Sequence, residues 1–250
     1  MMDFLRRLKL GQYVARKWVR SMFVYPKQTL EGGPLTYDAY WDKKRPPGNT
    51  ITLSPAERRR AEIISTRIGK NAVTVGDIGS GPGVVLRAII DACPGSTGVA
   101  FDSSERALDE ARKLGLVGEI LDITVPGAID TVRECDYYIV LEVLEHIPNS
   151  EVVLHALVKK AKKGVFFSVP NTGFLTHRFR LLFGKAPAQW IHMPNEHLRF
   201  WTIPDMRWWM RALGFKHAHI TPYQGAPGLR DLWPNLFAEG MVVSVEKRDL

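Results

Sequence analysis

Two groups of side chains in this sequence have the types and spacing that chemistry requires. The first is Glu142, Glu145 and His146, directly after the apolar residues 135–141. If they form one helical turn, the three side chains lie at i, i+3 and i+4 and share a face. His146 then suits a general base that takes a proton from a hydroxyl or amine, because imidazole titrates near neutrality. The cluster, with His197, could instead hold a divalent metal that polarises an acceptor oxygen. We favour the general base and keep the metal as an alternative.

The second group is a glycine-rich loop between the apolar residues 72–78 and a helical pattern at 84–92. The loop reads GSGPG over residues 79–83, and Asp77 stands two positions before its first glycine. Glycines let a backbone turn tightly and approach a ligand closely. A nicotinamide-dinucleotide loop spaces its glycines G-x-G-x-x-G, whereas this loop reads G-x-G-x-G. A carboxylate at Asp77 would repel a pyrophosphate but would welcome a charged amino group, such as that of a methionine moiety.

Two further acids are expected at the ends of neighbouring strands. Asp102 follows the strand predicted at residues 97–101, where a carboxylate suits ribose hydroxyls. Asp122 follows the strand predicted at 117–121, where it can accept from an adenine amino group while Ile123 provides an apolar flank. Since the carboxyl ends of parallel strands meet at one edge of a sheet, these acids and the glycine loop are expected around one topological switch point.

Strands and helices alternate from residue 72 onwards, which predicts an α/β fold with a doubly wound, mostly parallel seven-stranded sheet. The expected strands are residues 72–78, 97–101, 117–121, 135–141, 165–169, 215–221 and 241–245; the expected helices are 84–92, 105–114, 151–162 and one that opens at 202–205 and ends at Gly214. Ser54 and Glu57 predict a capping box that begins an earlier helix. Trp208, Trp209, Met210 and Leu213 are expected in the core.

At the glycine loop and its acids the chain resembles class I S-adenosylmethionine-dependent methyltransferases, over about residues 70–247. The resemblance implies S-adenosylmethionine as cofactor, a Rossmann-like sheet and a terminal strand hairpin with one antiparallel strand. The residues that it implies for cofactor binding are Asp77, Gly79, Ser80, Gly81, Gly83, Asp102, Ser103, Asp122, Ile123, Leu141 and Glu142. The E-x-x-E-H pattern of residues 142–146 also resembles ubiquinone-biosynthesis O-methyltransferases and small-RNA 3′-terminal 2′-O-methyltransferases, both of which use a metal.

A second resemblance covers residues 168–215, which read SVPN at 168–171, RFRLLFGK at 178–185 and TIPD at 202–205. This block is similar to MetW-type proteins of methionine biosynthesis and to related glycan and small-molecule methyltransferases. The glycine loop and residues 1–70 depart from the MetW pattern. In this fold the insert at about 170–202 lies where acceptor determinants are expected. The candidate acceptor residues are Arg178, Trp190, His197 and Arg199, with Tyr37, Tyr40 and Trp41 as a lid.

Charge is concentrated at the N-terminus. Residues 1–28 contain seven Lys or Arg and one Asp, hence +6 of the net +8, and leave +2 for the rest. Residues 1–56 are therefore interpreted as a basic amphipathic helix with a connecting or lid segment, and 57–250 as the cofactor-binding domain. The helix has three open interpretations: packing on the domain, contact with an anionic membrane surface or a partner protein, and a targeting peptide, which the scarcity of serine disfavours. A nearly neutral body argues against nucleic acid as partner.

We expect a methyltransferase that acts on an oxygen, or less readily a nitrogen, of a small molecule or glycan. One alternative is a MetW-like cofactor-binding partner or regulatory protein, and another is a metal-assisted RNA 3′-end 2′-O-methyltransferase. Two cysteines without metal-type spacing, and no apolar run of the roughly 20 residues that span a bilayer, favour a reduced, cytoplasmic location, with membrane-surface association left open. The sequence does not fix the oligomeric state.

Overall fold

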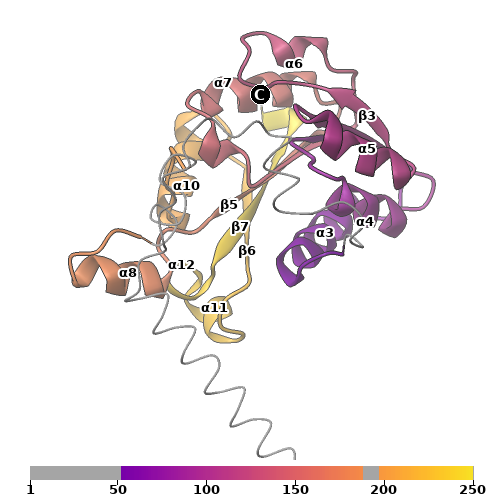
Figure 1. Ribbon diagram of the computed structural model, residues 1–250. Coiled ribbons are helices and arrows are strands. Elements are labelled where there is room, and N and C mark those ends of the chain that lie inside the picture. The colour runs from indigo at the N-terminus through magenta and orange to yellow at the C-terminus, as the bar shows by residue number, and fades with distance from the viewer. Residues whose placement is uncertain (1–51, 188–196, 250) are drawn as a thin grey trace, which may run out of the picture.

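The structure is a computed structural model that describes residues 52–187 and 197–249 (Figure 1). The basic helix expected within residues 1–28 and the candidate residues Tyr37, Tyr40, Trp41 and Trp190 lie outside this described part. The proposed domain boundary near residue 56 therefore stays a prediction. Within the described residues, no helix has both the length and the apolar character needed to cross a bilayer.

A seven-stranded mixed sheet forms the centre of the described chain, as predicted. The strands are β1 (Thr74–Ile78), β2 (Thr97–Asp102), β3 (Val117–Ile120), β4 (Tyr137–Leu141), β5 (Gly164–Pro170), β6 (His219–Tyr223) and β7 (Gly240–Glu246), in the order β3-β2-β1-β4-β5-β7-β6. The first five strands pair in parallel, and β7 runs antiparallel to both β5 and β6. The chain order reverses between β1 and β4, so the expected switch point is present.

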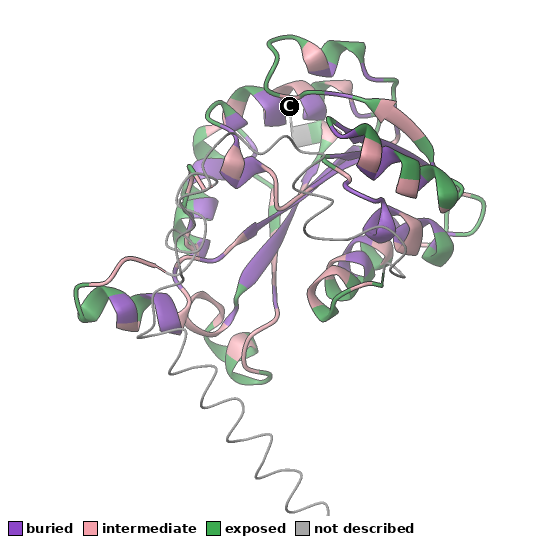
Figure 2. Cartoon of the chain, in the orientation of Figure 1, coloured by how far each residue is buried: buried purple, intermediate pink, exposed green. Residues whose placement is uncertain are grey.

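Helices cover both faces of the sheet (Figure 1). They are α3 (Pro55–Ile68), α4 (Val84–Ala92), α5 (Glu105–Lys113), α6 (Ala128–Thr131), α7 (Ser150–Lys160), α8 (Leu175–Leu182), α10 (Ile203–Ala212), α11 (Leu229–Leu232) and α12 (Pro234–Phe237), with 3-10 turns at Leu144–His146 and Lys247–Asp249. One apolar cluster joins α3, α4 and α5 to one sheet face, and a second joins α6, α7 and α10 to the other. Figure 2 shows the strands buried between these layers. The doubly wound architecture is confirmed.

Local signals account for several helix starts. Ser54 accepts a hydrogen bond from the Glu57 amide at 3.2 Å, and the Glu57 carboxylate accepts one from the Ser54 amide at 2.7 Å. Thr202 and Asp205 form the same reciprocal box at the start of α10. Each box satisfies amides that have no partner inside the helix.

Two expectations for the C-terminal part were wrong. The strand expected from residue 215 begins only at His219, because Phe215 turns into the core: its amide donates to the Met210 carbonyl and its ring packs 4.9 Å from that of His155. Trp208 is 64% exposed, whereas the next residue, Trp209, is buried. Successive helical residues point about 100° apart, so only one of the two tryptophans can face the sheet.

Candidate active site

The glycine loop connects β1 to α4 at the carboxyl edge of the sheet. The amides of Gly79 and Ser80 both donate to the Phe101 carbonyl, at 2.8 and 3.0 Å, which holds the loop against the end of β2. Gly79 has φ +72°, and a Cβ there would lie 2.7 Å from Cγ2 of Val143. Only glycine fits both the backbone angle and this space. The loop therefore offers bare backbone to a ligand, as expected for a cofactor cradle.

Asp102, at the end of β2, is tied to the glycine loop. It is 6% exposed, and its two oxygens accept from the Gly81 amide at 2.7 Å and the Ser104 amide at 2.9 Å. These bonds fix the orientation of the carboxylate. Ser103 beside it is exposed. The role of these two residues toward a ribose stays a prediction.

Asp77 is a buried carboxylate, 3% exposed, that accepts no hydrogen bond from the described part of the chain. Burial, and then the charge of Asp102, raise its pKa to about 8, against an opposing effect of Arg60. An unpaired buried acid is unfavourable, and a cationic ligand group would relieve it. The position thus fits the predicted contact with an ammonium group.

Asp122 and Ile123 follow β3 at the far side of the same edge. Oδ1 of Asp122 accepts from the amide of Thr124 at 2.9 Å and from its hydroxyl at 2.6 Å, a local turn that fixes an exposed carboxylate. Ile123 is half-buried against the core. Their contact with an adenine stays a prediction.

The expectation that Glu142 shares a helical face with Glu145 and His146 was wrong. Glu142 has φ +57°, so the chain leaves β4 in a left-handed conformation, and only Leu144–His146 form a 3-10 turn. Oε1 of Glu142 instead accepts from the Ser168 hydroxyl at 2.7 Å. A left-handed non-glycine residue is strained, and surrounding bonds must hold it in place.

A network that the sequence did not reveal surrounds Glu142. The hydroxyl of Tyr223 donates to Glu142 Oε1 at 3.1 Å, and Arg60 Nη1 lies 3.5 Å from the same oxygen. Arg60 Nη1 also donates to the Tyr223 hydroxyl at 2.9 Å, and its guanidinium lies 5.7 Å from the ring centroid. Burial and the neighbouring charge of Glu142 raise the pKa of Tyr223 strongly, so it stays a neutral donor. The network connects α3, β4, β5 and β6 at the candidate site.

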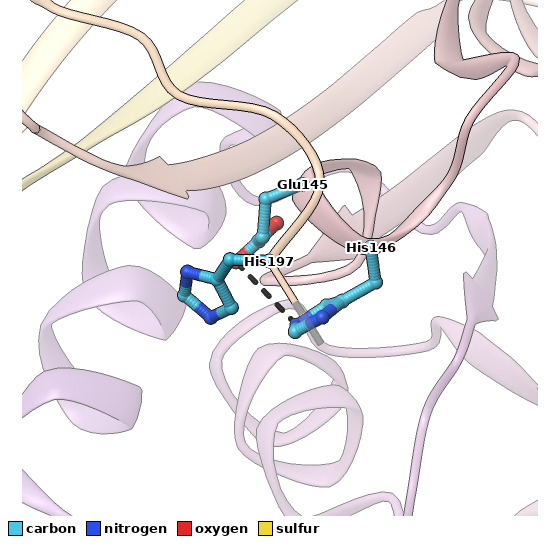
Figure 3. Close-up of side chains that lie close together, drawn as sticks. All are labelled: Glu145, His146 and His197. Carbon is cyan, nitrogen blue, oxygen red and sulfur yellow. Dashed lines mark ion pairs between the residues drawn. The ribbon is translucent and has the colours of Figure 1, made fainter. Parts of the chain in front are cut away.

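Glu145, His146 and His197 come together at the same edge (Figure 3). One ligand-type atom from each lies within 4.8 Å of the others. His146 Nε2 is 3.9 Å from Glu145 Oε1, and the two imidazole rings meet edge to face at 4.7 Å. The amides of Leu198 and Arg199 donate to the Glu145 carbonyl, at 2.8 and 3.0 Å, and fix the returning insert beside the cluster. The sequence predicted this grouping but also placed Glu142 in it, and the structure does not.

The electrostatics of this cluster are unusual. The Glu145 side chain is 1% exposed, and its Oε2 has no hydrogen-bond partner among the described residues. Burial, followed by the charge of Glu142, raises the pKa of Glu145 well above its ordinary value. Burial and the neighbouring His146 lower the pKa of His197. One orphaned carboxylate oxygen beside two imidazoles is a donor set that fits a divalent metal.

The candidate acceptor residues that the structure describes make different contacts. Arg199 forms a two-pronged ion pair with Glu151 on α7, at 2.7 and 2.9 Å, and also donates to the Pro148 carbonyl. Its guanidinium thus holds the insert on α7, and these contacts give no support to the substrate role that we expected. Arg178 is exposed and donates from Nε to the Gly173 carbonyl at 2.6 Å. Of the three candidate acceptor residues that the structure describes, His197 is the one that joins the candidate active site.

The sheet order and the glycine loop are those of the class I S-adenosylmethionine-dependent methyltransferase fold. A family described as "Methyltransferase domain" matches residues 44–220, and the chain belongs to this family. The "Ubiquinone biosynthesis O-methyltransferase" of Methylococcus capsulatus is 32% identical over 142 residues, which are 53% of this chain and 56% of that protein. The protein of the same name from Pseudomonas fluorescens is 26% identical over 181 residues, 70% of this chain and 77% of its own length. The chain thus spans little more than half of the first relative.

Solved structures share the fold at low sequence identity. The small RNA methyltransferase HEN1 has a TM-score of 0.58 at 20% identity and covers 80% of this chain and 27% of its own. Magnesium protoporphyrin IX methyltransferase from Synechocystis PCC 6803, solved with bound SAH, has a TM-score of 0.55 at 14% identity and covers 84% of this chain and 97% of its own. At such identities the likeness concerns the fold alone.

Proposed function

We propose that this protein is an active S-adenosylmethionine-dependent O-methyltransferase that acts on a hydroxyl of a small molecule or glycan. The observation that carries the proposal is the group Glu145, His146 and His197 beside the glycine loop. It provides a base at the edge where a cofactor would lie. The matched O-methyltransferases of ubiquinone biosynthesis support oxygen as the acceptor atom.

In this proposal the chain binds and aligns the reactants. S-adenosylmethionine supplies an electrophilic methyl group, which passes directly to the acceptor oxygen as the sulfur–carbon bond breaks and S-adenosylhomocysteine leaves. Asp77 receives the ammonium of the methionine moiety, and Asp102 receives the ribose hydroxyls. His146 takes the proton of the acceptor hydroxyl, so the oxygen attacks with a free electron pair. Alignment of the two reactants provides most of the rate.

A metal-assisted form of the same reaction is the second candidate. The orphaned Oε2 of Glu145 and the imidazoles of His146 and His197 would hold the ion. A divalent metal there would lower the pKa of the acceptor hydroxyl. Under this candidate a chelator stops turnover and added metal restores it; under the first, turnover survives chelation.

The partner-protein and RNA-end alternatives remain as rivals. Both alternatives have the same fold as the proposed enzyme and differ from it only in the molecules that they bind or methylate. A MetW-like partner would bind the cofactor without turning it over, and an RNA-end enzyme would methylate an oligonucleotide. A panel of phenolic, glycan and short RNA acceptors separates them.

The first experiment is isothermal titration with S-adenosylmethionine and S-adenosylhomocysteine on the wild type and on Asp102→Ala. We expect micromolar binding that the substitution weakens at least about tenfold, because it removes the ribose contact and loosens the glycine loop. Absence of binding to either ligand would overturn the proposal.

The second experiment tests the base. His146→Ala should keep cofactor affinity but lower kcat by at least about a hundredfold. His217→Ala, which removes an exposed imidazole elsewhere, is the matched control and should leave kcat unchanged. Equal kcat in both variants would remove His146 from the reaction.

A further inference from the structure

A second concavity lies between the end of α10 and the start of β6 and has a volume of about 380 Å³. Three exposed cations line it, Arg207 and Arg211 from α10 and Lys216 from the turn that follows. The buried side chains of Met210 and Phe215 give it an apolar part. We call it the basic concavity. Its volume lies within the roughly 300–1,000 Å³ that small-molecule sites occupy.

The basic concavity lies at the edge of the sheet opposite the glycine loop. Because β7 runs antiparallel to both β5 and β6, β6 runs in the same direction as the five parallel strands. His219, which also lines the concavity, is the first residue of β6 and therefore lies toward the amino edge. The glycine loop and Glu145 instead follow the carboxyl ends of β1 and β4. A ligand in the concavity would thus be a molecule additional to the cofactor.

The three cations have no anionic partner in the described part of the chain. The side chains of Arg207, Arg211 and Lys216 form no ion pair or hydrogen bond with any residue described there. No acid is among the residues that line the concavity. Arg207 and Arg211 are four residues apart on α10, so they share a face on which like charges repel. The helix dipole favours a cation in the last turn, which explains Arg211 but neither of the other two.

The elements around the concavity do not compensate this charge. Asp205 is bound in the capping box of α10, and Glu151 of α7 is paired within the ion pair described above. Residues 246–249, at and after the end of β7, contain two acids and two bases and leave the balance unchanged. Burial and then the charge of Arg67 on α3 lower the pKa of His219, so a further cation is near. The concavity therefore attracts anions.

We propose that the basic concavity binds a small molecule that carries a diphosphate group. Two guanidinium groups and one ammonium group offer a formal charge of +3, which two linked phosphates match and a single carboxylate does not. The planar fork of arginine binds phosphate oxygens in pairs. S-adenosylmethionine contains no phosphate, so this ligand differs from the cofactor. The proposal does not depend on the proposed methyl transfer.

The test is isothermal titration of the full chain in magnesium-free buffer with inorganic pyrophosphate, ADP, orthophosphate and pentaglutamate. The test variant is Arg207→Gln with Arg211→Gln. The matched control is Arg58→Gln with Lys113→Gln, which removes two exposed cations from α3 and α5. Urea unfolding checks that each variant is folded. Titration with S-adenosylmethionine tests the proposed function separately, so the failure of one proposal leaves the other standing.

We expect pyrophosphate to bind the wild type and the control variant equally, and the test variant about ten- to a hundredfold more weakly, because each guanidinium lost removes charge-assisted hydrogen bonds. Orthophosphate should bind more weakly than pyrophosphate, and salt should weaken both. ADP that binds more tightly than pyrophosphate would assign an organic diphosphate, whereas equal binding would assign the diphosphate group alone.

Three results would overturn the proposal. The first is the absence of binding of both pyrophosphate and ADP, or an equal loss in the two variants. The second is displacement of pyrophosphate by S-adenosylhomocysteine, which would place the anion at the glycine loop. The third is pentaglutamate that binds as tightly as pyrophosphate, which would assign the concavity to an acidic segment of a partner protein.

Discussion

Replacing Asp77 with asparagine should stabilise the cofactor-free protein while it weakens cofactor binding. The carboxylate is buried, accepts no hydrogen bond from the described residues, and has a pKa raised to about 8 from a reference of 3.8. Between these two values the folded protein keeps a proton that the unfolded chain releases. Folding stability therefore falls as pH rises through this window, and Asp77→Asn removes that loss.

The magnitude follows from the size of the pKa shift. One unit corresponds to about 1.4 kcal/mol, and pH 7 lies roughly three units above the reference value, which sets an upper limit of about 4 kcal/mol. Local relaxation and water entry reduce this limit. We expect Asp77→Asn to raise the free energy of unfolding by about 1–3 kcal/mol at pH 7, and by progressively less toward pH 4.

The assay is urea unfolding followed by tryptophan fluorescence at pH 5, 6, 7 and 8 without cofactor. Asp130→Asn, at an exposed position on α6, is the control and should have little effect at any pH. Saturating S-adenosylmethionine should reverse the order of stability, since only the wild type gains the ion pair with the ligand ammonium. A stability difference that does not grow with pH, or a wild type that is more stable than the variant at pH 8 without ligand, would refute the reasoning.

Three further substitutions test the surroundings of the site. Gly79→Ala should lower the free energy of unfolding by about 1–2 kcal/mol and weaken cofactor binding in calorimetry, because its Cβ would lie 2.7 Å from Val143 and its φ is +72°. Unchanged affinity would contradict the proposal that the glycine loop binds the cofactor. Tyr223→Phe should lower the free energy of unfolding in urea by about 1–2 kcal/mol, since it removes the donor to Glu142; a change below about 0.3 kcal/mol would show that the network adds nothing. Arg199→Ala should lower stability by about 0.5–1.5 kcal/mol, as its ion pair is partly exposed, and leave KM unchanged; a raised KM at unchanged stability would restore its substrate role.

Local patterns made most of the fold predictable. The strands have short apolar runs, and the glycine loop has a specific spacing. The capping box of Ser54 and Glu57, a motif only four residues long, identifies the start of α3. Such signals depend only on neighbouring residues. The error at Phe215 has a different origin: an apolar residue can enter the core from a turn as well as from a strand, and only tertiary packing decides between them.

The candidate site was predictable in its parts but not in its connections. Glu145, His146 and His197 meet as expected. Arg60 and Tyr223 are 163 residues apart, and nothing local distinguishes Arg60 from the two arginines before it. Glu142 has a left-handed backbone and is bonded to these distant partners, and a helical periodicity assumed from the sequence could foresee neither feature.

The insert at about 170–202, where the sequence predicts acceptor determinants, has its two ends joined by direct contacts between them. Asn171 and Trp201 form an isolated β-bridge, and the Thr172 amide donates to the Trp201 carbonyl at 2.9 Å. Once two ends are fixed in this way, the entropy of closing the loop changes only slowly with its length. Evolution can therefore lengthen, shorten or replace the residues between these ends while the sheet and the glycine loop stay intact. If the insert carries the predicted acceptor determinants, we expect a segment from a relative grafted between these two residues to change acceptor preference while the sheet and the glycine loop stay unchanged.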